Sequence, residues 1–485
     1  MFMGIDLGTS GVKVCLVGED LMPVVSATVA LKISHPRSGY SEQNPQDWWL
    51  AVQEAVAKVL DLEPRGTSSL RGIGLSGQMH GAVLLDRQKQ VIRPAILWND
   101  GRSDAECAAL VADRPELSAL AGVTLMAGFT APKILWLKAH EPESYARIRH
   151  VLLPKDYLGL QMHGQMMTDP CDAAGTWWFD EAARRWSPEL CAATATNPDW
   201  LPQVRDGPEI AGYLRSDVAA LLGLPAGIPI ATGGGDAAAG AIAVGAVKDG
   251  AGFISLGTSG QLFVTTDTFR AAPDEGIHSY AHCVPKLWFQ MAAMLNGARP
   301  MSWFSEMTDM PVGDLLTEAE GARLDRVPLF LPYLTGERTP HGDARIRGAF
   351  YGLDNDTGRP EMMRAIVDAI AYSFADARDA IASVTPVPRP LLAIGGGSKS
   401  NLLLQTIADV MGSTLHQGED SDVGPALGAA RLGAVAAGVV TVGDLGWTPQ
   451  INAVFEPLPT GRHEGRLTTY HALYAALKGV RDLPR

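Results

Sequence analysis

The pattern of apolar and polar positions at the start of the chain predicts a β-hairpin. Residues 1–17 read MFMGIDLGTSGVKVCLV, two apolar runs on either side of Gly-Thr-Ser-Gly. Apolar, β-branched runs joined by a glycine-rich turn are typical of paired strands. The first run also carries Asp6, and burying a carboxylate in an apolar strand is costly unless something pairs with it. We therefore expect a partner for Asp6, such as a metal ion.

The same motif recurs in the second half of the chain. Residues 252–264 read GFISLGTSGQLFV, which again predicts strand, turn and strand. Glycines and small hydroxyl residues at a hairpin tip leave backbone N–H groups free to surround an anion. Aligned on LGTSG, Asp6 corresponds to Ser255, so one copy carries a carboxylate and the other does not. This asymmetry predicts one nucleotide bound between two related domains, with the first hairpin on the metal side and the second at the phosphates.

Between and after the hairpins, strand-like and helix-like segments alternate. Asn44-Pro45 predicts an N-cap and a first helical residue, followed by an amphipathic helix. Its apolar face would comprise Trp48, Trp49, Val52, Val56, Val59 and Leu60. Residues 228–247 and 390–412 each predict a buried strand, a glycine turn and a helix. The pattern indicates an α/β fold, and we place a domain boundary between an N-terminal domain, 1–247, and a C-terminal domain, 248–485.

Length and composition narrow the class of protein. A chain of 485 residues is long enough for two large domains, and 46% hydrophobic with 19% charged residues is typical of a globular protein. A formal net charge of -13 argues against a nucleic-acid partner. Five cysteines without CxxC spacing predict neither a disulfide framework nor zinc, and favour the cytoplasm. The most apolar region, 427–440, is interrupted by glycine and predicts a buried helix rather than a membrane span.

The glycine triplets predict an anion site. GxxxxGK[ST] is absent, and GxGxxG does not occur between a strand and a helix, so a nucleotide would not be held by either common loop. Instead, each GGG precedes a predicted helix N-terminus, where exposed amides and the helix dipole favour anions. Asp236 follows the first triplet. It is interpreted either as an N-cap or, taken with Asp6, as a carboxylate that accepts the proton of an attacking hydroxyl.

Two loops carry donors and acceptors beside an aromatic side chain, as a polyhydroxylated ligand requires. Their candidate residues are Gln78, Met79, His80, Trp98, Asn99, Asp100 and Arg102. Structural roles for His80 and Trp98 stay open as the alternative. His278 and His282 have i, i+4 spacing, but their segment is strand-like and lacks a third ligand nearby, so we do not expect zinc. The Trp177-Trp178 pair predicts core packing or a cleft wall.

Motifs along nearly the whole chain resemble those of the FGGY carbohydrate kinases, part of the actin, hexokinase and heat-shock ATPase superfamily. They are GIDLGTSGVK (4–13), GQMHG (77–81), PAILWNDGR (94–102), LLPKDYL (152–158), GGGDAAAGA (233–241), SLGTSG (255–260), FLPYLTGERTPH (330–341), GAFYGLDNDTGRPEMMRAIVDAI (348–370), IGGGSKSN (394–401) and DVGPALGAA (422–430). GQMHG, WNDGR and LLPKDYL are most similar to the xylulokinase branch.

The resemblance implies two ribonuclease-H-like domains, of the actin/hexokinase type, flanking a catalytic cleft. It implies transfer of the ATP γ-phosphoryl group to a ketopentose such as D-xylulose. Asp236 would be the base and Asp6 would hold Mg²⁺, mostly through water, with both carboxylates at the metal. Thr9, Ser10 and Lys13 would face the transferred group, Gly257 and Thr258 the nucleotide phosphates, and Gly396, Gly397 and Asn401 the adenosine. Met79, His80, Trp98 and Asp236 would line the sugar site.

One position departs from the family pattern. Xylulokinases have Asp-Asn after the triple glycine, whereas residue 237 here is Ala. The missing amide removes a hydrogen bond to the sugar and weakens discrimination. Another pentulose or a polyol, such as ribulose or arabinitol, therefore stays open as substrate, as does an actin-like ATPase or sugar-binding regulator. We expect no membrane partner, and the resemblance is compatible with a homodimer.

Overall fold

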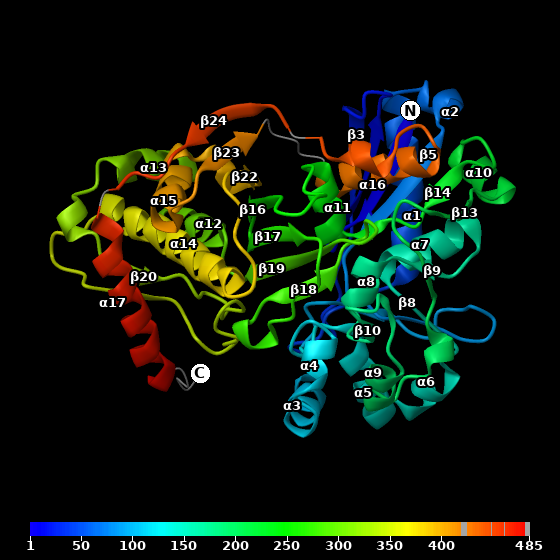
Figure 1. Ribbon diagram of the computed structural model, residues 1–485, viewed down its shortest axis with the longest axis horizontal. Coiled ribbons are helices and arrows are strands. Elements are labelled where there is room, and N and C mark those ends of the chain that lie inside the picture. The colour runs from blue at the N-terminus through cyan, green and yellow to red at the C-terminus, as the bar shows by residue number, and fades with distance from the viewer. Residues whose placement is uncertain (419–423, 448, 460, 481–485) are drawn as a thin grey trace.

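Two lobes, each built on a seven-stranded sheet, make up the structure (Figure 1). It is a computed structural model that describes residues 1–418, 424–447, 449–459 and 461–480. The first two residues of the DVGPALGAA motif, Asp422 and Val423, lie outside the described residues. The first sheet has the order β13-β14-β5-β1-β2-β3, with β15 also paired to β5. Its strands are β1 (Phe2–Leu7), β2 (Gly11–Val17), β3 (Pro23–Ala30), β5 (Gly72–Gly77), β13 (Ile210–Tyr213), β14 (Pro229–Ala231) and β15 (Gly234–Gly235).

The second sheet repeats the plan of the first. Its order is β18-β19-β17-β16-β22-β23-β24. Its strands are β16 (Gly252–Leu256), β17 (Gly260–Thr266), β18 (His278–Ala281), β19 (Trp288–Met294), β22 (Leu391–Ile394), β23 (Leu415–Gly418) and β24 (Ile451–Phe455). In each sheet an antiparallel hairpin, β1-β2 or β16-β17, is followed by a parallel partner, β5 or β22. The predicted pair of LGTSG hairpins is thus confirmed.

The two hairpins share the sequence LGTSG but differ in how their strands pair next to the turn. In the first, Leu7 pairs with Val12, so four residues form the tip. In the second, Leu256 pairs with Gly260, so three residues form it. The shift places Asp6 opposite Lys13 but Ser255 opposite Gln261. The tips therefore present different backbone surfaces to any ligand.

Helices cover both sheets, and further short strands form two-stranded pairs outside the two large sheets. The helices are α1 (Pro45–Leu62), α2 (Gly66–Ser69), α3 (Asp104–Asp113), α4 (Leu117–Leu120), α5 (Thr130–His140), α6 (Pro142–Arg147), α7 (Pro154–His163), α8 (Pro170–Ala174), α9 (Pro188–Ala193), α10 (Ser216–Leu222), α11 (Asp236–Ala243), α12 (Arg299–Thr308), α13 (Val312–Glu320), α14 (Arg359–Ala382), α15 (Asn401–Met411), α16 (Gly424–Ala436) and α17 (Arg462–Leu477). The short strands are β4 (Glu42–Gln43), β6 (Val83–Leu85), β7 (Ala95–Ile96), β8 (His150–Leu152), β9 (Met167–Thr168), β10 (Phe179–Asp180), β11 (Arg185–Trp186), β12 (Gln203–Val204), β20 (Leu329–Leu331) and β21 (Ala349–Tyr351).

Local signals explain the predicted helices. Asn44 is the N-cap of α1, and its side-chain oxygen accepts a hydrogen bond from the Gln46 N–H at 3.2 Å. The predicted apolar face of α1 packs into the core beside the first sheet, with Leu60 at its half-buried margin. Both glycine triplets lie where predicted, between β14 and α11 and between β22 and α15. Trp177 and Trp178 are buried in the core, as expected. Across the described ranges, no helix has the length and apolar character needed to cross a bilayer.

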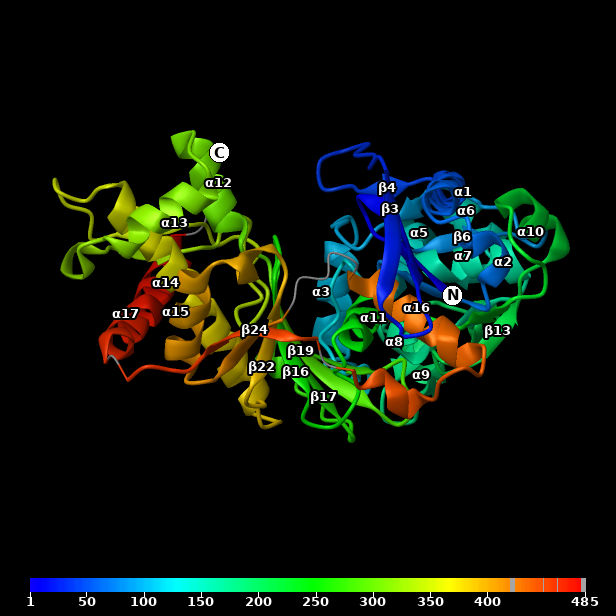
Figure 2. The same cartoon turned by 90° about the horizontal axis from the view of Figure 1, so that it is seen from above.

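One helix from the end of the chain lies in the lobe built by its beginning. α16 packs against β1, β5 and α11 (Figures 1 and 2). The contact is close because glycines face backbone: a Cβ atom at Gly428 would lie 1.8 Å from the Ala239 carbonyl oxygen. A Cβ atom at Gly4 would meet the Ala426 carbonyl at the same distance. The domain boundary at 247/248 remains a prediction, and α16 shows that a segment beyond it completes the first lobe.

A buried arginine fixes the far end of the same contact. The Arg431 side chain, on α16, is 0% exposed, and its Nη1 donates to the carbonyl oxygens of Ile242 at 3.1 Å and Ala243 at 3.0 Å. These carbonyls belong to the C-terminal end of α11, where a cation is favoured by the helix dipole. The guanidinium also lies 4.5 Å from the ring centroid of Trp447. α11 is thereby held along its length and at its end.

We expect Gly428→Ala to destabilise the protein by about 3 kcal/mol, because the new methyl group meets rigid backbone and α16 must move away from α11. Gly465→Ala is the matched control, since this exposed glycine of α17 has open space where a Cβ would lie. It should stabilise by roughly 0.5–1 kcal/mol through helix propensity. Urea unfolding of both variants checks the prediction. Equal stabilities would show that the α16–α11 contact is looser than described.

Candidate active site

The topology of the first sheet brings the two predicted carboxylates together. Asp6 lies in β1, and its register partner in β5 is Ser76. On the other side of β5, Ser76 pairs with Gly234, and Asp236 follows as the first residue of α11. β5 therefore separates the two carboxylates by one strand. Gly235, not Asp236, is the N-cap of α11, so the N-cap interpretation of Asp236 is wrong.

Burial makes both carboxyl groups costly to ionise, and the charge of Asp6 adds to that cost for Asp236. Burial, followed by the charge of Asp6, raises the pKa of Asp236 to about 7. Burial raises the pKa of Asp6 to about 6, with the Ser76 hydroxyl and the Lys13 charge acting in the opposite direction. Two acids with raised pKa values side by side are typical of a catalytic or cation-binding site.

The donor set fits a hard divalent cation. Asp6 Oδ1 is buried and has no hydrogen-bond partner among the described residues. Carboxylate oxygens are the ligands that Mg²⁺ prefers, usually one or two of them together with water and substrate phosphate. A cation near Asp6 would satisfy this oxygen and remove the repulsion between the two acids. The geometry thus agrees with the predicted partner for Asp6, although the metal itself stays a prediction.

His80 is held in one strained conformation directly after Met79, which lies against Gly235, the residue before Asp236. His80 follows β5 with a backbone φ of 72°, a left-handed conformation that costs a non-glycine residue about 1 kcal/mol. Its carbonyl oxygen accepts from Lys133 Nζ at 2.7 Å and from the Thr130 hydroxyl at 3.1 Å. These two bonds hold the strained backbone, so His80 is positioned rather than free to choose a conformation.

The imidazole of His80 has a defined tautomer. Its Nδ1 lies 2.6 Å from the Gly175 carbonyl oxygen, so Nδ1 carries the proton. Burial lowers the pKa of His80 to about 3, with smaller contributions from Lys133, His278 and Arg338. The ring is therefore neutral at physiological pH, and Nε2 is a hydrogen-bond acceptor. An acceptor in this position suits a sugar hydroxyl.

The tip of the first hairpin is tied to the two polar loops. The Trp98 Nε1 donates to Thr9 Oγ1 at 2.8 Å, and this hydroxyl donates to Gln78 Oε1 at 2.9 Å. Gln43 Nε2 donates to the Thr9 carbonyl oxygen at 2.8 Å. Thr9 therefore stands at the centre of a network, and its hydroxyl already has both a donor and an acceptor. The Trp98 ring keeps its face for other contacts.

Several loop residues predicted for the ligand are used by the fold instead. Arg102 Nη2 pairs with Asp100 Oδ2 at 2.7 Å and with Glu42 Oε1 at 2.6 Å, and its guanidinium lies 3.9 Å from the Tyr40 ring centroid. Gln78 is taken up by the Thr9 network. The sequence could not separate these residues from His80 and Trp98, because their partners lie far away along the chain.

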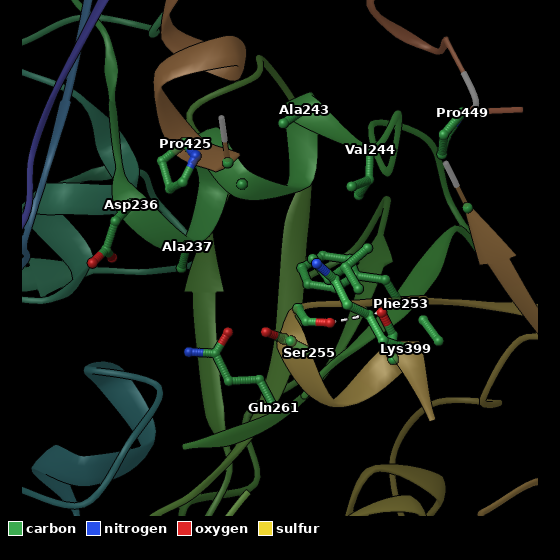
Figure 3. Close-up of a pocket in the computed structure, with 18 residues that line it drawn as sticks. Asp236, Ala237, Ala243, Val244, Phe253, Ser255, Gln261, Lys399, Pro425 and Pro449 are labelled. Carbon is green, nitrogen blue, oxygen red and sulfur yellow. Dashed lines mark hydrogen bonds between the residues drawn. The ribbon is translucent and has the colours of Figure 1, made fainter. Parts of the chain in front are cut away.

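A cavity of about 410 Å³ extends from Asp236 into the second lobe, and Asp6 is not among its lining residues. Figure 3 shows Asp236 at one end and Lys399 and Pro449 toward the other, with Ser255 and Gln261 between them. Of the predicted site residues, Asp236 and Gly396 line it. Thr9, Ser10, Lys13, Gly257, Thr258, Gly397 and Asn401 are not among its lining residues. Met79, His80 and Trp98 belong to the first-lobe side of the site, beside Gly175, Phe129 and Thr9.

The sequence interpretation missed some lining residues. Lys399 lies in the second glycine turn, and its position in GGGSKSN was the signal that could have identified it. Ser255 and Gln261 come from opposite strands of the second hairpin. The cavity ends between the second glycine turn, the second hairpin and the start of α16. This arrangement exposes backbone amides and small side chains. It suits a ligand with phosphate groups and a flat ring.

Comparison with known proteins agrees with this geometry. Residues 1–243 match the FGGY family of carbohydrate kinases, N-terminal domain, and residues 252–437 match the FGGY family of carbohydrate kinases, C-terminal domain. The chain belongs to the FGGY family of carbohydrate kinases. The predicted family and the two-domain, actin-like α/β fold are therefore confirmed.

Individual FGGY proteins are similar over most of the chain. It is 43% identical to the xylulose kinase of Escherichia coli over 90% of both chains. It is 42% identical to the xylulose kinase of Klebsiella pneumoniae, again over 90% of both chains. The crystal structure of a xyloylose kinase from Brucella ovis matches with a TM-score of 0.94 and 42% identity, covering 99% of each chain. This FGGY chain is therefore a carbohydrate kinase with the two-lobed fold of those relatives.

We predict that metal-free protein loses stability as the pH rises from about 4 to 7. Asp236 keeps its proton in the folded state up to a pKa of about 7, whereas the unfolded side chain ionises near 3.8. Stability is then present below the unfolded value and is lost as the pH rises through the folded one, by up to about 4 kcal/mol. Asp236→Asn should therefore exceed the natural protein by about 1–2 kcal/mol at pH 5 and by up to about 4 kcal/mol at pH 8.

Thermal melts at both pH values with EDTA check this prediction, and Mg²⁺ should raise the pH 8 melting temperature of the natural protein more than that of the variant. The same pH dependence for the two proteins across this range would contradict the raised pKa of the buried Asp236.

Proposed function

We propose that this FGGY kinase transfers the γ-phosphoryl group of ATP to D-xylulose, forming D-xylulose 5-phosphate. The proposal rests on the position of Asp236. This residue lines the start of the cavity between the lobes, on the side of the site that contains His80 and suits a sugar. Relatives at 43% and 42% identity over most of their length are xylulose kinases, which supports the choice of sugar.

Asp236 is suited to the role of general base. Its pKa of about 7 lies near neutral pH, where a carboxylate can accept the proton of an attacking hydroxyl efficiently. Its place at the first turn of α11 fixes the carboxylate relative to the cavity, because α11 is held by α16 and by Arg431. In the proposed reaction, the sugar hydroxyl oxygen attacks the γ-phosphorus, the proton passes to Asp236 and ADP leaves.

The sugar would be oriented by the first lobe. Neutral His80 would accept a hydrogen bond from a sugar hydroxyl through Nε2, and the face of Trp98 would pack against sugar carbon atoms. The strain at His80 and its three hydrogen bonds preorganise this contact before the sugar arrives. Orientation of this kind lowers the entropic cost of reaching the reactive geometry.

The nucleotide would occupy the cavity between the lobes. Gly395 and Gly396 line this cavity and would expose backbone to the adenosine. Gly397, in the same turn, and Asn401, the first residue of α15, would border it from outside the cavity lining. Gly257 and Thr258 at the second hairpin tip, and Thr9, Ser10 and Lys13 at the first, would contact the phosphates. Asp6, with Asp236, would hold Mg²⁺, which when bound neutralises phosphate charge. All five cysteines are free and buried, and we propose a cytoplasmic location. A homodimer is proposed from the family resemblance.

The first test is ADP release from MgATP with D-xylulose, D-ribulose, L-ribulose, D-arabinitol and glycerol, against a control without sugar. We expect D-xylulose to give the highest kcat/KM and the control to give little ADP. Asp236→Asn should reduce kcat by at least about 100-fold with little change in sugar binding, because the base is lost while the sugar contacts remain. ADP release independent of sugar would instead indicate an ATPase, and preference for another sugar would indicate a different kinase specificity.

Position 237 allows a second test of specificity. Ala237 lines the cavity directly after Asp236, where an amide could reach a bound ligand (Figure 3). Ala237→Asn should raise kcat/KM for the preferred pentulose about tenfold relative to D-arabinitol, since one added hydrogen bond is worth about 1–3 kcal/mol of discrimination. Ala237→Val controls for the added volume. An unchanged ratio in the Asn variant would remove residue 237 from the specificity of this enzyme.

A further inference from the structure

Arg338, from the C-terminal half of the chain, is held rigidly at the junction of the two lobes. Its preceding residue, Glu337, accepts through Oε1 from the Leu295 N–H at 2.6 Å and from the Arg338 N–H at 2.8 Å. Its following residue, Thr339, accepts from the Ala293 N–H at 3.1 Å and donates to the Gly276 carbonyl at 2.7 Å. The backbone on both sides is thus anchored at the end of β19, so the side chain emerges from a fixed point.

The guanidinium of Arg338 reaches the first lobe. Its Cζ lies 5.4 Å from the ring centroid of Trp98. It donates no hydrogen bond to any residue that the structure describes, although Arg338 is half-buried. A guanidinium has five N–H donors in a planar fork, and leaving them unused in a partly desolvated place is costly. The position therefore calls for an oxygen-rich ligand.

A second polar side chain of the C-terminal half faces the same place. His278, at the start of β18, is 4% exposed, and its Nδ1 has no hydrogen-bond partner among the described residues. Its ring lies 6.1 Å from Phe129, which in turn lies 4.9 Å from His80. Burial is the main cause of the lowered pKa values of His80 and His278, and the positive charge of Arg338 lowers both further.

We propose that Arg338 and His278 form the second wall of the acceptor-sugar site, opposite His80 and Trp98, and hydrogen-bond hydroxyl oxygens of the sugar away from the reacting one. This inference rests on the proposed kinase function. Two adjacent hydroxyl oxygens match the fork of a guanidinium, and a neutral imidazole nitrogen adds a third contact. Because the two walls belong to different lobes, a bound sugar bridges them.

The sugar, rather than the nucleotide, is the ligand favoured for Arg338. The cavity assigned to the nucleotide is lined by the glycine turns, Lys399 and the second hairpin, and Arg338 is not among its lining residues. Arg338 instead lies over Trp98 and beside His80, on the sugar side of Asp236. The two ligands are separable by kinetics, because each has its own KM.

The experiment compares Arg338→Met, Arg338→Lys and the control Arg345→Met, an exposed arginine of the same segment, with the natural protein. KM for the preferred sugar of the panel and KM for MgATP are measured for each, with melting temperatures as a check of folding. We expect Arg338→Met to raise the sugar KM at least tenfold and to leave the ATP KM within twofold. Arg338→Lys should raise the sugar KM less, and Arg345→Met should leave both unchanged.

If Arg338→Met has the same sugar KM as the natural protein, Arg338 does not contact the sugar and the inference is wrong. The proposed kinase function is unaffected by that result. A selective rise in the ATP KM also overturns the inference and assigns Arg338 to the phosphates. If Arg338→Met does not fold, Arg338→Lys decides, because a charge without the planar fork should still raise the sugar KM several-fold. If the natural protein phosphorylates no sugar of the panel, the proposed function fails first and the wall fails with it.

Discussion

The packing of α16 on α11 and the first sheet is the contact on which the active site depends. Gly428 lets the two helices meet backbone to backbone, and Arg431 holds the carbonyl end of α11. Asp236 is the first residue of that same helix, so the position of its carboxylate follows from a contact made by the far end of the chain. A larger residue at the contact would displace α11, and Asp236 with it, before any ligand bound.

The electrostatics of the site follow from this fixed geometry. β5 stands between β1 and the turn into α11, and it sets Asp6 and Asp236 one strand apart. Burial raises both pKa values, and the charge of Asp6 raises that of Asp236 further. Two buried acids are unfavourable to ionise together when the site is empty at neutral pH, and the proposed cation would offset this cost.

Much of this arrangement could be predicted from local sequence, and the remainder could not. The hairpins, the N-cap Asn44 and the two glycine triplets depend on residues close together in the chain, and all were predicted. The roles of Asp100 and Arg102 were not, because Glu42 and Tyr40, which pair with Arg102, come from a distant segment. Arg338 was likewise missed, since its contact with Trp98 joins residues of different lobes. Motifs of residues close together in the chain therefore indicated the chemistry. Which polar side chains pair with one another could be seen only in the folded structure.

In the proposed function, the two-lobed construction would also favour transfer of phosphate to a sugar over transfer to water. His80 and Trp98 would face the sugar from one lobe, and Arg338 reaches Trp98 from the other. A water molecule offers these side chains a single oxygen, whereas a sugar offers several hydroxyl groups at once. Binding energy from hydroxyls that do not react would then hold the lobes in the geometry in which Asp236 faces both sugar and phosphate. Phosphoryl transfer is thereby coupled to the presence of the correct acceptor, through contacts remote from the reacting oxygen.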